Sequence, residues 1–215
     1  MNRTPACLVA AALMLSAAAP LSALEAASRN ADAAPAFPQP SVSPVSWQFD
    51  FEHTTPQRIV VEVGTEANPV AYWYMTYRVT NNTDRERMFL PVFEMVDKDG
   101  RVIPSDRAIP PEVFTAIKAR ERNQFLQPHT QIGGELRLGA DQAKDGVAIW
   151  PEPAAEMGAF NIFVSGLSGE TAELKIGDAA FTLRKSLKLD FHVRGDHIRP
   201  GEDPIDPTVK EWVMR

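Results

Sequence analysis

The chain has 215 residues, a formal net charge of -6 and 44% hydrophobic residues, so it is long enough for one well-buried domain and is mildly acidic. This acidity argues against nucleic acid or an anionic membrane as the partner. Cys7 is the only cysteine and lies in the N-terminal apolar run. A mature chain without that run has no disulfide, no cysteine nucleophile and no thiolate metal site.

The N-terminal residues have the pattern of an export signal. Arg3 precedes an almost uninterrupted apolar run over residues 7–24, and small residues follow it. We therefore expect a signal peptide over residues 1–28 and a periplasmic or extracellular location, with no membrane span after cleavage. A transmembrane anchor is the alternative, because the run approaches the roughly 18 to 20 residues that span a bilayer. Its many weakly apolar alanines argue against an anchor.

Composition divides the rest of the chain into three parts. Residues 29–45 are rich in alanine and proline, which is typical of an extended linker. We expect the folded domain over residues 46–193. Residues 194–215 carry several prolines and acidic residues, which predicts a polar C-terminal tail.

Within the domain, apolar residues recur at every second position, which is the period of a half-buried β-strand. Pro91 cannot donate to a strand ladder, so we expect an edge or a bulge there. Lys185 is the one charged residue on the apolar face of the longest segment. The predicted strands cover residues 46–52, 59–63, 73–79, 88–96, 146–150, 160–165 and 181–193.

One segment favours a helix. Residues 110–112 (Pro-Pro-Glu) provide a proline start and an acidic first turn, after which Val113, Phe114 and Ile117 share one face. The helix lies in an insertion over residues 104–132, which is much longer than the connections that a sandwich needs.

The predominance of strands favours a mainly β fold, namely an antiparallel β-sandwich of about seven to nine strands with one short helix in the insertion. An open barrel is the alternative. Residues 77–83 (Tyr-Arg-Val-Thr-Asn-Asn-Thr) and 96–100 (Val-Asp-Lys-Asp-Gly) resemble a pattern found in immunoglobulin-like domains of exported bacterial proteins of unknown function. The resemblance implies an extracytoplasmic immunoglobulin-like sandwich, used for adhesion or assembly, and it brings no catalytic residues.

Three short motifs have plain structural explanations. Residues 194–196 form an Arg-Gly-Asp tripeptide at a point where a long strand must turn. Residues 166–169 (Gly-Leu-Ser-Gly) are one residue short of a nucleophile elbow and lead into another strand. Residues 81–83 satisfy the glycosylation sequon, but they also have the composition of a hairpin turn.

Metal binding is the main alternative function, because exported sandwiches can hold copper on His and Met side chains. The chain has four histidines, and the best group by ligand type is His192 with Asp196 and His197. No spacing singles this group out, so the leading interpretation includes no metal or other cofactor.

No constellation of residues predicts a reaction. The leading interpretation is an exported, non-enzymatic binding or assembly module of the cell envelope, with an envelope or extracellular protein as its partner. A periplasmic metal-binding or small-ligand-binding protein is second, and a hydrolase is third. We place the partner surface on the insertion, where Arg120 and Arg122 are side chains of the kind that anchors interfaces. The alternative is that the insertion only caps the core.

Overall fold

The computed structural model describes residues 37–64, 68–152, 158–193 and 205–215. The predicted signal peptide and the start of the predicted linker, residues 29–36, lie outside these ranges. As predicted, the described residues form mainly antiparallel strands, with one helix of more than two turns. Among them, no helix has the length and apolar character needed to cross a bilayer.

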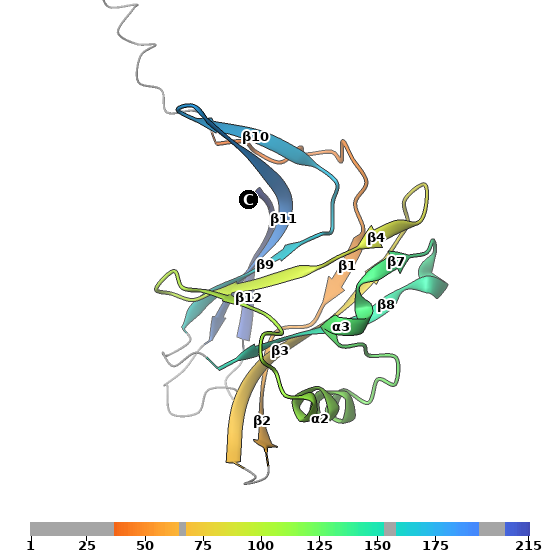
Figure 1. Ribbon diagram of the computed structural model, residues 1–215, viewed down its shortest axis with the longest axis vertical. Coiled ribbons are helices and arrows are strands. Elements are labelled where there is room, and N and C mark those ends of the chain that lie inside the picture. Colours follow the sequence, from red (N-terminus) through yellow and green to blue (C-terminus); the bar gives the residue numbers. More distant parts are fainter. Residues whose placement is uncertain (1–36, 65–67, 153–157, 194–204) are drawn as a thin grey trace, which may run out of the picture. The chain divides into compact units, whose positions relative to one another are not determined.

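The first sheet is built around β3 (Asn68–Thr80), its longest strand. β1 (Asp50–His53) and β2 (Gln57–Val63) pair antiparallel with successive parts of one edge of β3. β8 (Lys144–Pro151) pairs antiparallel with the other edge, and Figure 1 shows these strands running together through the lower half of the domain. The sheet therefore has β3 at its centre and β8 along one side.

The second sheet has the order β10-β11-β9-β5-β6, with β12 on the other edge of β11. All of its pairs are antiparallel. Its strands are β5 (Val92–Val96), β6 (Val102–Pro104), β9 (Ala159–Ser165), β10 (Thr171–Ile176), β11 (Ala179–Val193) and β12 (Ile205–Met214).

A short ladder between β4 (Arg87–Phe89) and β7 (Gly134–Leu136) stands apart from the two sheets. It arises because the predicted strand over residues 88–96 is interrupted at Pro91, so that β4 and β5 pair with different partners. With these short strands the described residues contain twelve strands, more than the seven to nine that we expected.

The main core lies between the two sheets. Trp73 pairs with Trp150 across β3 and β8, and both side chains are fully buried. Burial of a side chain of this kind stabilises the fold by about 1.5 to 3 kcal/mol. The second sheet supplies the facing residues Phe93, Met95, Phe160, Ile162, Val164, Leu187, Leu189 and Phe191.

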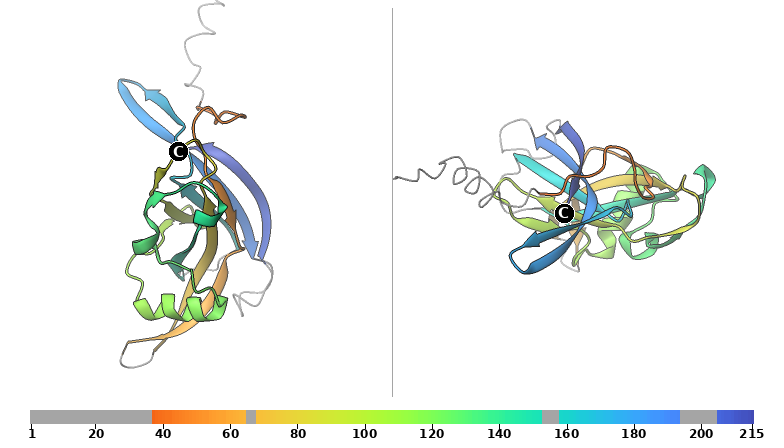
Figure 2. Two further views of the ribbon diagram at one scale, coloured as in Figure 1. Left: turned by 90° about the vertical axis from the view of Figure 1, so that its right-hand side faces the viewer. Right: turned by 90° about the horizontal axis from the view of Figure 1, so that it is seen from above.

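A second, smaller core lies on the other face of the first sheet. Tyr72 and Tyr74 point to this face, where α2 (Pro111–Glu121) covers them with Val113 and Ile117. The left view of Figure 2 shows α2 lying across the β2–β3 end of the sheet. The predicted helix and its apolar face are confirmed, and the insertion buries the face of β3 opposite to the one that carries Trp73.

The turn after β3 explains the sequence motif at residues 81–83. Asn81 is fully buried, and its Nδ2 donates to the carbonyl oxygens of Arg85 and Leu136 over 3.0 and 2.8 Å. Its Oδ1 accepts hydrogen bonds from the amide and hydroxyl of Thr83. Because both hydrogens of the amide are in use and the group is buried, Asn81 serves the turn and is not a glycan acceptor in the folded domain.

The predicted polar tail contains a strand instead, because β12 pairs with β11 over residues 205–214. Pro207 argued against a strand, since proline cannot donate to a ladder. The register shifts between Asp190 and Phe191, so the irregularity falls where Pro207 pairs. Met214 is buried, which ties the C-terminal end of β12 to the core.

The last part of the predicted linker, residues 37–45, has no regular secondary structure, but Ser41 is bonded to the second sheet. Its amide donates to Oε1 of Glu170 over 2.7 Å, and its carbonyl oxygen accepts from Nζ of Lys185 over 3.3 Å. Nζ of Lys185 also lies 2.9 Å from Oε2 of Glu170, and both side chains are buried. The charge of Lys185 on the apolar face of β11 is therefore paired, and the ion pair attaches residues 37–45 to the second sheet.

Candidate functional site

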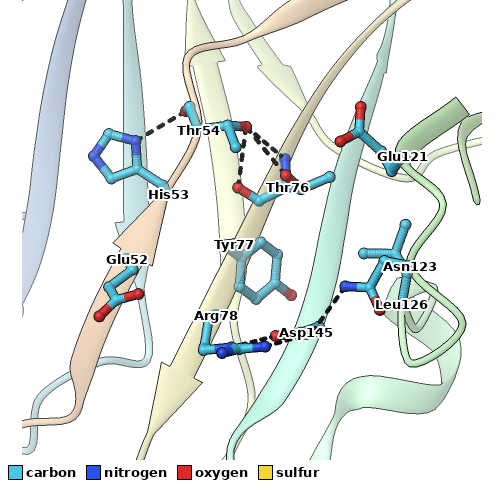
Figure 3. A pocket seen from close by; sticks show the side chains of 10 residues that line it. All are labelled: Glu52, His53, Thr54, Thr76, Tyr77, Arg78, Glu121, Asn123, Leu126 and Asp145. Atoms are coloured by element: carbon cyan, nitrogen blue, oxygen red, sulfur yellow. Dashed lines mark hydrogen bonds and ion pairs between the residues drawn. The ribbon is translucent and has the colours of Figure 1, made fainter.

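Two adjoining pockets open beside Asp145, close to the start of β8. One has a volume of about 290 Å³ and lies between β1, β3 and the loop that follows α2. The other, of about 530 Å³, lies between the same loop and residues 140–145. The pockets share Arg78, Leu126 and Asp145, and we call the combined depression the Arg78 groove. Figure 3 shows the first pocket.

An ion pair forms the middle of the Arg78 groove. Nε and Nη2 of Arg78 donate to Oδ1 and Oδ2 of Asp145 over 2.6 and 2.9 Å. Nδ2 of Asn123 donates to Oδ2 of the same carboxylate over 2.8 Å (Figure 3). The guanidinium, together with the amide, holds the pKa of Asp145 below its usual range although burial opposes this shift. The two-pronged contact fixes the orientation of both charged groups.

Tyr77 stands against β8 because the facing residue is glycine. A Cβ atom at Gly146 would lie 2.5 Å from Cζ of Tyr77 and 2.3 Å from Cδ1 of Ile132, so no larger residue fits without movement. The hydroxyl of Tyr77 is buried and has no hydrogen-bond partner among the described residues. Burial raises its pKa, which keeps the hydroxyl protonated.

His53 and Thr54 lie at the other end of the first pocket (Figure 3). Nδ1 of His53 donates to the carbonyl oxygen of Thr54 over 3.0 Å. Burial lowers the pKa of His53, so its ring is neutral at pH 7 and Nε2 is available as an acceptor. The hydroxyl of Thr54 is bonded to Thr76. This end of the groove therefore offers uncharged polar groups beside the carboxylates of Glu52 and Glu121.

The loop over residues 122–127 is held in one shape by its neighbours. Oδ1 of Asn123 accepts a hydrogen bond from the amide of Phe125 over 2.9 Å. The amide of Gln127 donates to the carbonyl oxygen of Asp145 over 2.9 Å. Because these contacts tie both ends of the loop to β8 and to the ion pair, the loop has little freedom to lose when a partner binds.

This loop displays a large apolar side chain. Leu126 points inward and is only 2% exposed, whereas its neighbour Phe125 is 70% exposed at the border of the larger pocket. Leu126 thus anchors the loop, and Phe125 is presented to solvent beside the Arg78 groove.

The two arginines predicted to bind a partner differ in their surroundings. Nη1 of Arg120 donates to the carbonyl oxygen of Arg58 over 2.9 Å, and its guanidinium lies 5.8 Å from the ring centroid of Tyr74. Arg120 therefore covers the edge of β2. Arg122 ends α2 in the left-handed conformation, with φ of 52°, and is exposed without an ion-pair or hydrogen-bond partner among the described residues. Arg122 is the freer of the two for an outside partner.

The predicted metal residues fall largely outside the described part of the chain. His192 lies on β11 and is exposed, whereas Asp196 and His197 belong to residues 194–204, which are not described. Within the described ranges, no group of three or more His, Cys, Asp or Glu side chains is arranged to hold a metal ion.

Sequence reasoning missed the residues that make up the Arg78 groove. Arg78 lies within the predicted strand over residues 73–79, and Asp145 directly precedes the predicted strand over residues 146–150, but nothing in the sequence singles out either residue. The composition of this region could have indicated a binding site, because four carboxamide side chains flank Phe125 in the sequence. They are Asn123, Gln124, Gln127 and Gln131.

The fold and the site together define a two-sheet antiparallel sandwich with a polar groove beside an insertion. Searches of family models and of curated proteins found no match. Among solved structures, a match was found to the crystal structure of the yjhA protein from Bacillus subtilis, with a TM-score of 0.36 and 11% identity over 68% of this chain and 95% of that chain. A similarity this low carries no argument about fold or function.

Proposed function

We propose that this chain is an exported, non-enzymatic binding module of the cell envelope, and that it captures an envelope or extracellular macromolecule with the loop over residues 122–127. The exposed Phe125 is the observation that supports this most. A side chain with 70% exposure gains the free energy of burial only when a partner covers it. Aromatic and arginine side chains also dominate binding energies at interfaces, and Arg122 stands in the same loop.

The immunoglobulin-like resemblance belongs to the same proposal. Both motifs that carry it form turns here: Asn81 closes the turn after β3, and Oδ1 of Asp97 accepts hydrogen bonds from the amides of Asp99 and Arg101. Such turns support a sandwich that presents loops at its ends, which suits adhesion or assembly.

Capture from envelope extracts tests the proposed function. We expect the immobilised full chain to retain a partner, and Phe125→Ala or Arg122→Glu to reduce the captured amount at least fivefold, as expected for the loss of about 1 kcal/mol or more at an anchor residue. Captured protein is measured by mass spectrometry and captured polysaccharide by sugar analysis.

Phe181→Ala is the matched control, because Phe181 is also a half-exposed phenylalanine, 49% exposed, and lies on the β10–β11 hairpin. Its variant should capture as the natural chain does. Arg120 is a poor test position, because its bond to β2 couples binding to stability. Equal capture by the natural chain and the two loop variants would contradict the proposed function.

Export has its own test. We expect protein recovered from the native host to begin between Leu24 and Arg29, because small residues follow the apolar run there. N-terminal sequencing of envelope and cytoplasmic fractions measures this. An intact Met1 on protein confined to the cytoplasm would show that the segment is not a cleaved signal.

A further inference from the structure

We propose that the Arg78 groove binds a neutral polysaccharide chain, with Phe125 packed against the face of one sugar ring. This inference rests on the proposed function, because it names the chemical class of the partner. The larger pocket, about 530 Å³, lies within the roughly 300 to 1,000 Å³ range of ligand sites. The loop over residues 122–127 carries the exposed aromatic ring and two of the glutamines that line this pocket, Gln124 and Gln127.

The polar side chains of the groove match hydroxyl groups. Gln124 and Gln127 of the loop and Gln131 of the short helix α3 (His129–Ile132) line the larger pocket. Asn123 lines the smaller pocket, where its amide is already bonded to Asp145 and to the backbone of Phe125. Each carboxamide has two donors and an acceptor in one plane, and a sugar hydroxyl likewise donates one hydrogen bond and accepts others. Neighbouring hydroxyls on a sugar ring therefore find both kinds of partner along the loop.

The three basic side chains that line the groove each have a partner. Arg78 is paired with Asp145. Nζ of Lys118 donates to the carbonyl oxygen of Leu126, and Nζ of Lys144 donates to the carbonyl oxygen of Ile132, each over 3.1 Å.

The sum of the charges also favours a neutral ligand. Apart from the uncharged His53 and Tyr77, the ionisable side chains that line the two pockets are four carboxylates and three cations, so their charges nearly cancel. An anionic ligand would need basic groups inside the groove that are free to pair with it, and Arg122, the arginine of the loop that has no partner among the described residues, lines neither pocket. A neutral ligand needs none.

An extended peptide fits this place less well. Peptides commonly add to a free strand edge through main-chain hydrogen bonds. Here the outer edge of β8 is occupied, because the amides of Gln127 and Asp106 donate to the carbonyl oxygens of Asp145 and Ile149 over 2.9 and 2.7 Å. Apart from Phe125 and the inward Leu126, the apolar residues of the larger pocket are two alanines, so it has no deep socket for a peptide side chain.

Phe125 supplies the apolar contact that a sugar ring can use. One face of a pyranose ring presents C–H groups, which pack against an aromatic face as other apolar groups do. Because the backbone of Phe125 is held by Asn123 and by the buried Leu126, the side chain leaves the loop from a fixed point at the border of the pocket.

Calorimetric titration of the full chain tests the inference. The probes are soluble cello-, xylo- and chito-oligosaccharides as neutral glycans, oligogalacturonate as an acidic glycan, and a mixture of unstructured peptides. We expect binding to at least one neutral glycan, a roughly tenfold higher Kd for Phe125→Ala, equivalent to about 1.4 kcal/mol, and an unchanged Kd for Phe181→Ala. Circular dichroism shows that each variant is folded.

Three results would overturn the inference: no binding to any neutral glycan, stronger binding to the acidic glycan or the peptides, or equal Kd values for the natural chain and Phe125→Ala. The proposed function is judged separately. If extracts yield a captured protein that depends on Phe125 while neutral glycans do not bind, the binding module stands and the glycan inference fails. If capture is indifferent to Phe125, both fail.

Discussion

Lys185→Met is expected to destabilise the domain by about 3 to 5 kcal/mol, the usual cost of leaving one member of a buried ion pair without its partner. Lys185 is 2% exposed and Glu170 is 7% exposed, and their charged atoms lie 2.9 Å apart. Nζ of Lys185 also lies 5.3 Å from the ring centroid of Trp212 on β12. Methionine has a similar length, so the loss reports the unpaired carboxylate of Glu170 more than a cavity.

The double variant Lys185→Met/Glu170→Gln separates charge from packing. Glutamine keeps an acceptor for the amide of Ser41 but removes the buried charge. Most of the lost stability should therefore return, and urea denaturation measures it. Lys188→Ala is the control, because Lys188 forms partly exposed pairs with Asp190 and Glu211, and such pairs contribute about 0 to 1 kcal/mol. Equal midpoints of urea unfolding for Lys185→Met and the natural chain would contradict a stabilising role of the buried ion pair.

The stability that the Lys185–Glu170 ion pair contributes depends on pH in a predictable way. Burial alone would raise the pKa of Glu170, but the amide of Ser41 and the ammonium of Lys185 outweigh it, so the pKa lies below its ordinary value of 4.5. A group with a lowered folded pKa stabilises fully above its unfolded pKa. Because the unfolded pKa of Glu170 is the same in both chains, the stability difference between the natural chain and Lys185→Met should be constant above the pKa that Glu170 has in the folded variant. It should shrink as the pH falls from that pKa to the lower pKa that Glu170 has beside Lys185.

Much of the fold follows from local pattern, because one buried face imposes a period of two on each strand. The strands around Phe51, Trp73 and Ile162 were predicted for this reason. β12 was missed because Pro207 argued against a strand. The proline is accommodated by an irregularity in the pairing with β11, which cannot be predicted from the sequence of β12 alone. The burial of Tyr74 was missed because the helix that covers it, which carries Phe114, lies about 40 residues later in the chain.

The Arg78 groove could not be assembled from the sequence for a related reason. Arg78 and Asp145 are 67 positions apart, and only the register between β3 and β8 brings them together. The insertion was predicted because its length is visible in the chain. Which of its side chains face solvent was not visible, since that depends on how Leu126 and the loop pack against β8.

The long strand β11 gives the last expected result. Its apolar alternation predicts one continuous core face, but burial divides it, because Leu187 is 1% exposed and Phe181 is 49% exposed. The reason is in the pairing: residues 187–192 lie between β9 and β12, whereas residues 179–184 pair with β10 as a hairpin. The left view of Figure 2 shows this hairpin extending away from the rest of the second sheet.

Leu187→Ala should therefore cost about 2 to 5 kcal/mol, because it leaves a cavity between the two sheets. Phe181→Ala removes a larger side chain, yet it should cost under about 1 kcal/mol, because the hairpin leaves that ring half in water. Thermal and urea unfolding of the two variants measure the difference. Equal melting temperatures would mean that the outer half of β11 is packed as tightly as the inner half. The division of the strand would then be wrong, and Phe181 would no longer serve as an exposed control for Phe125.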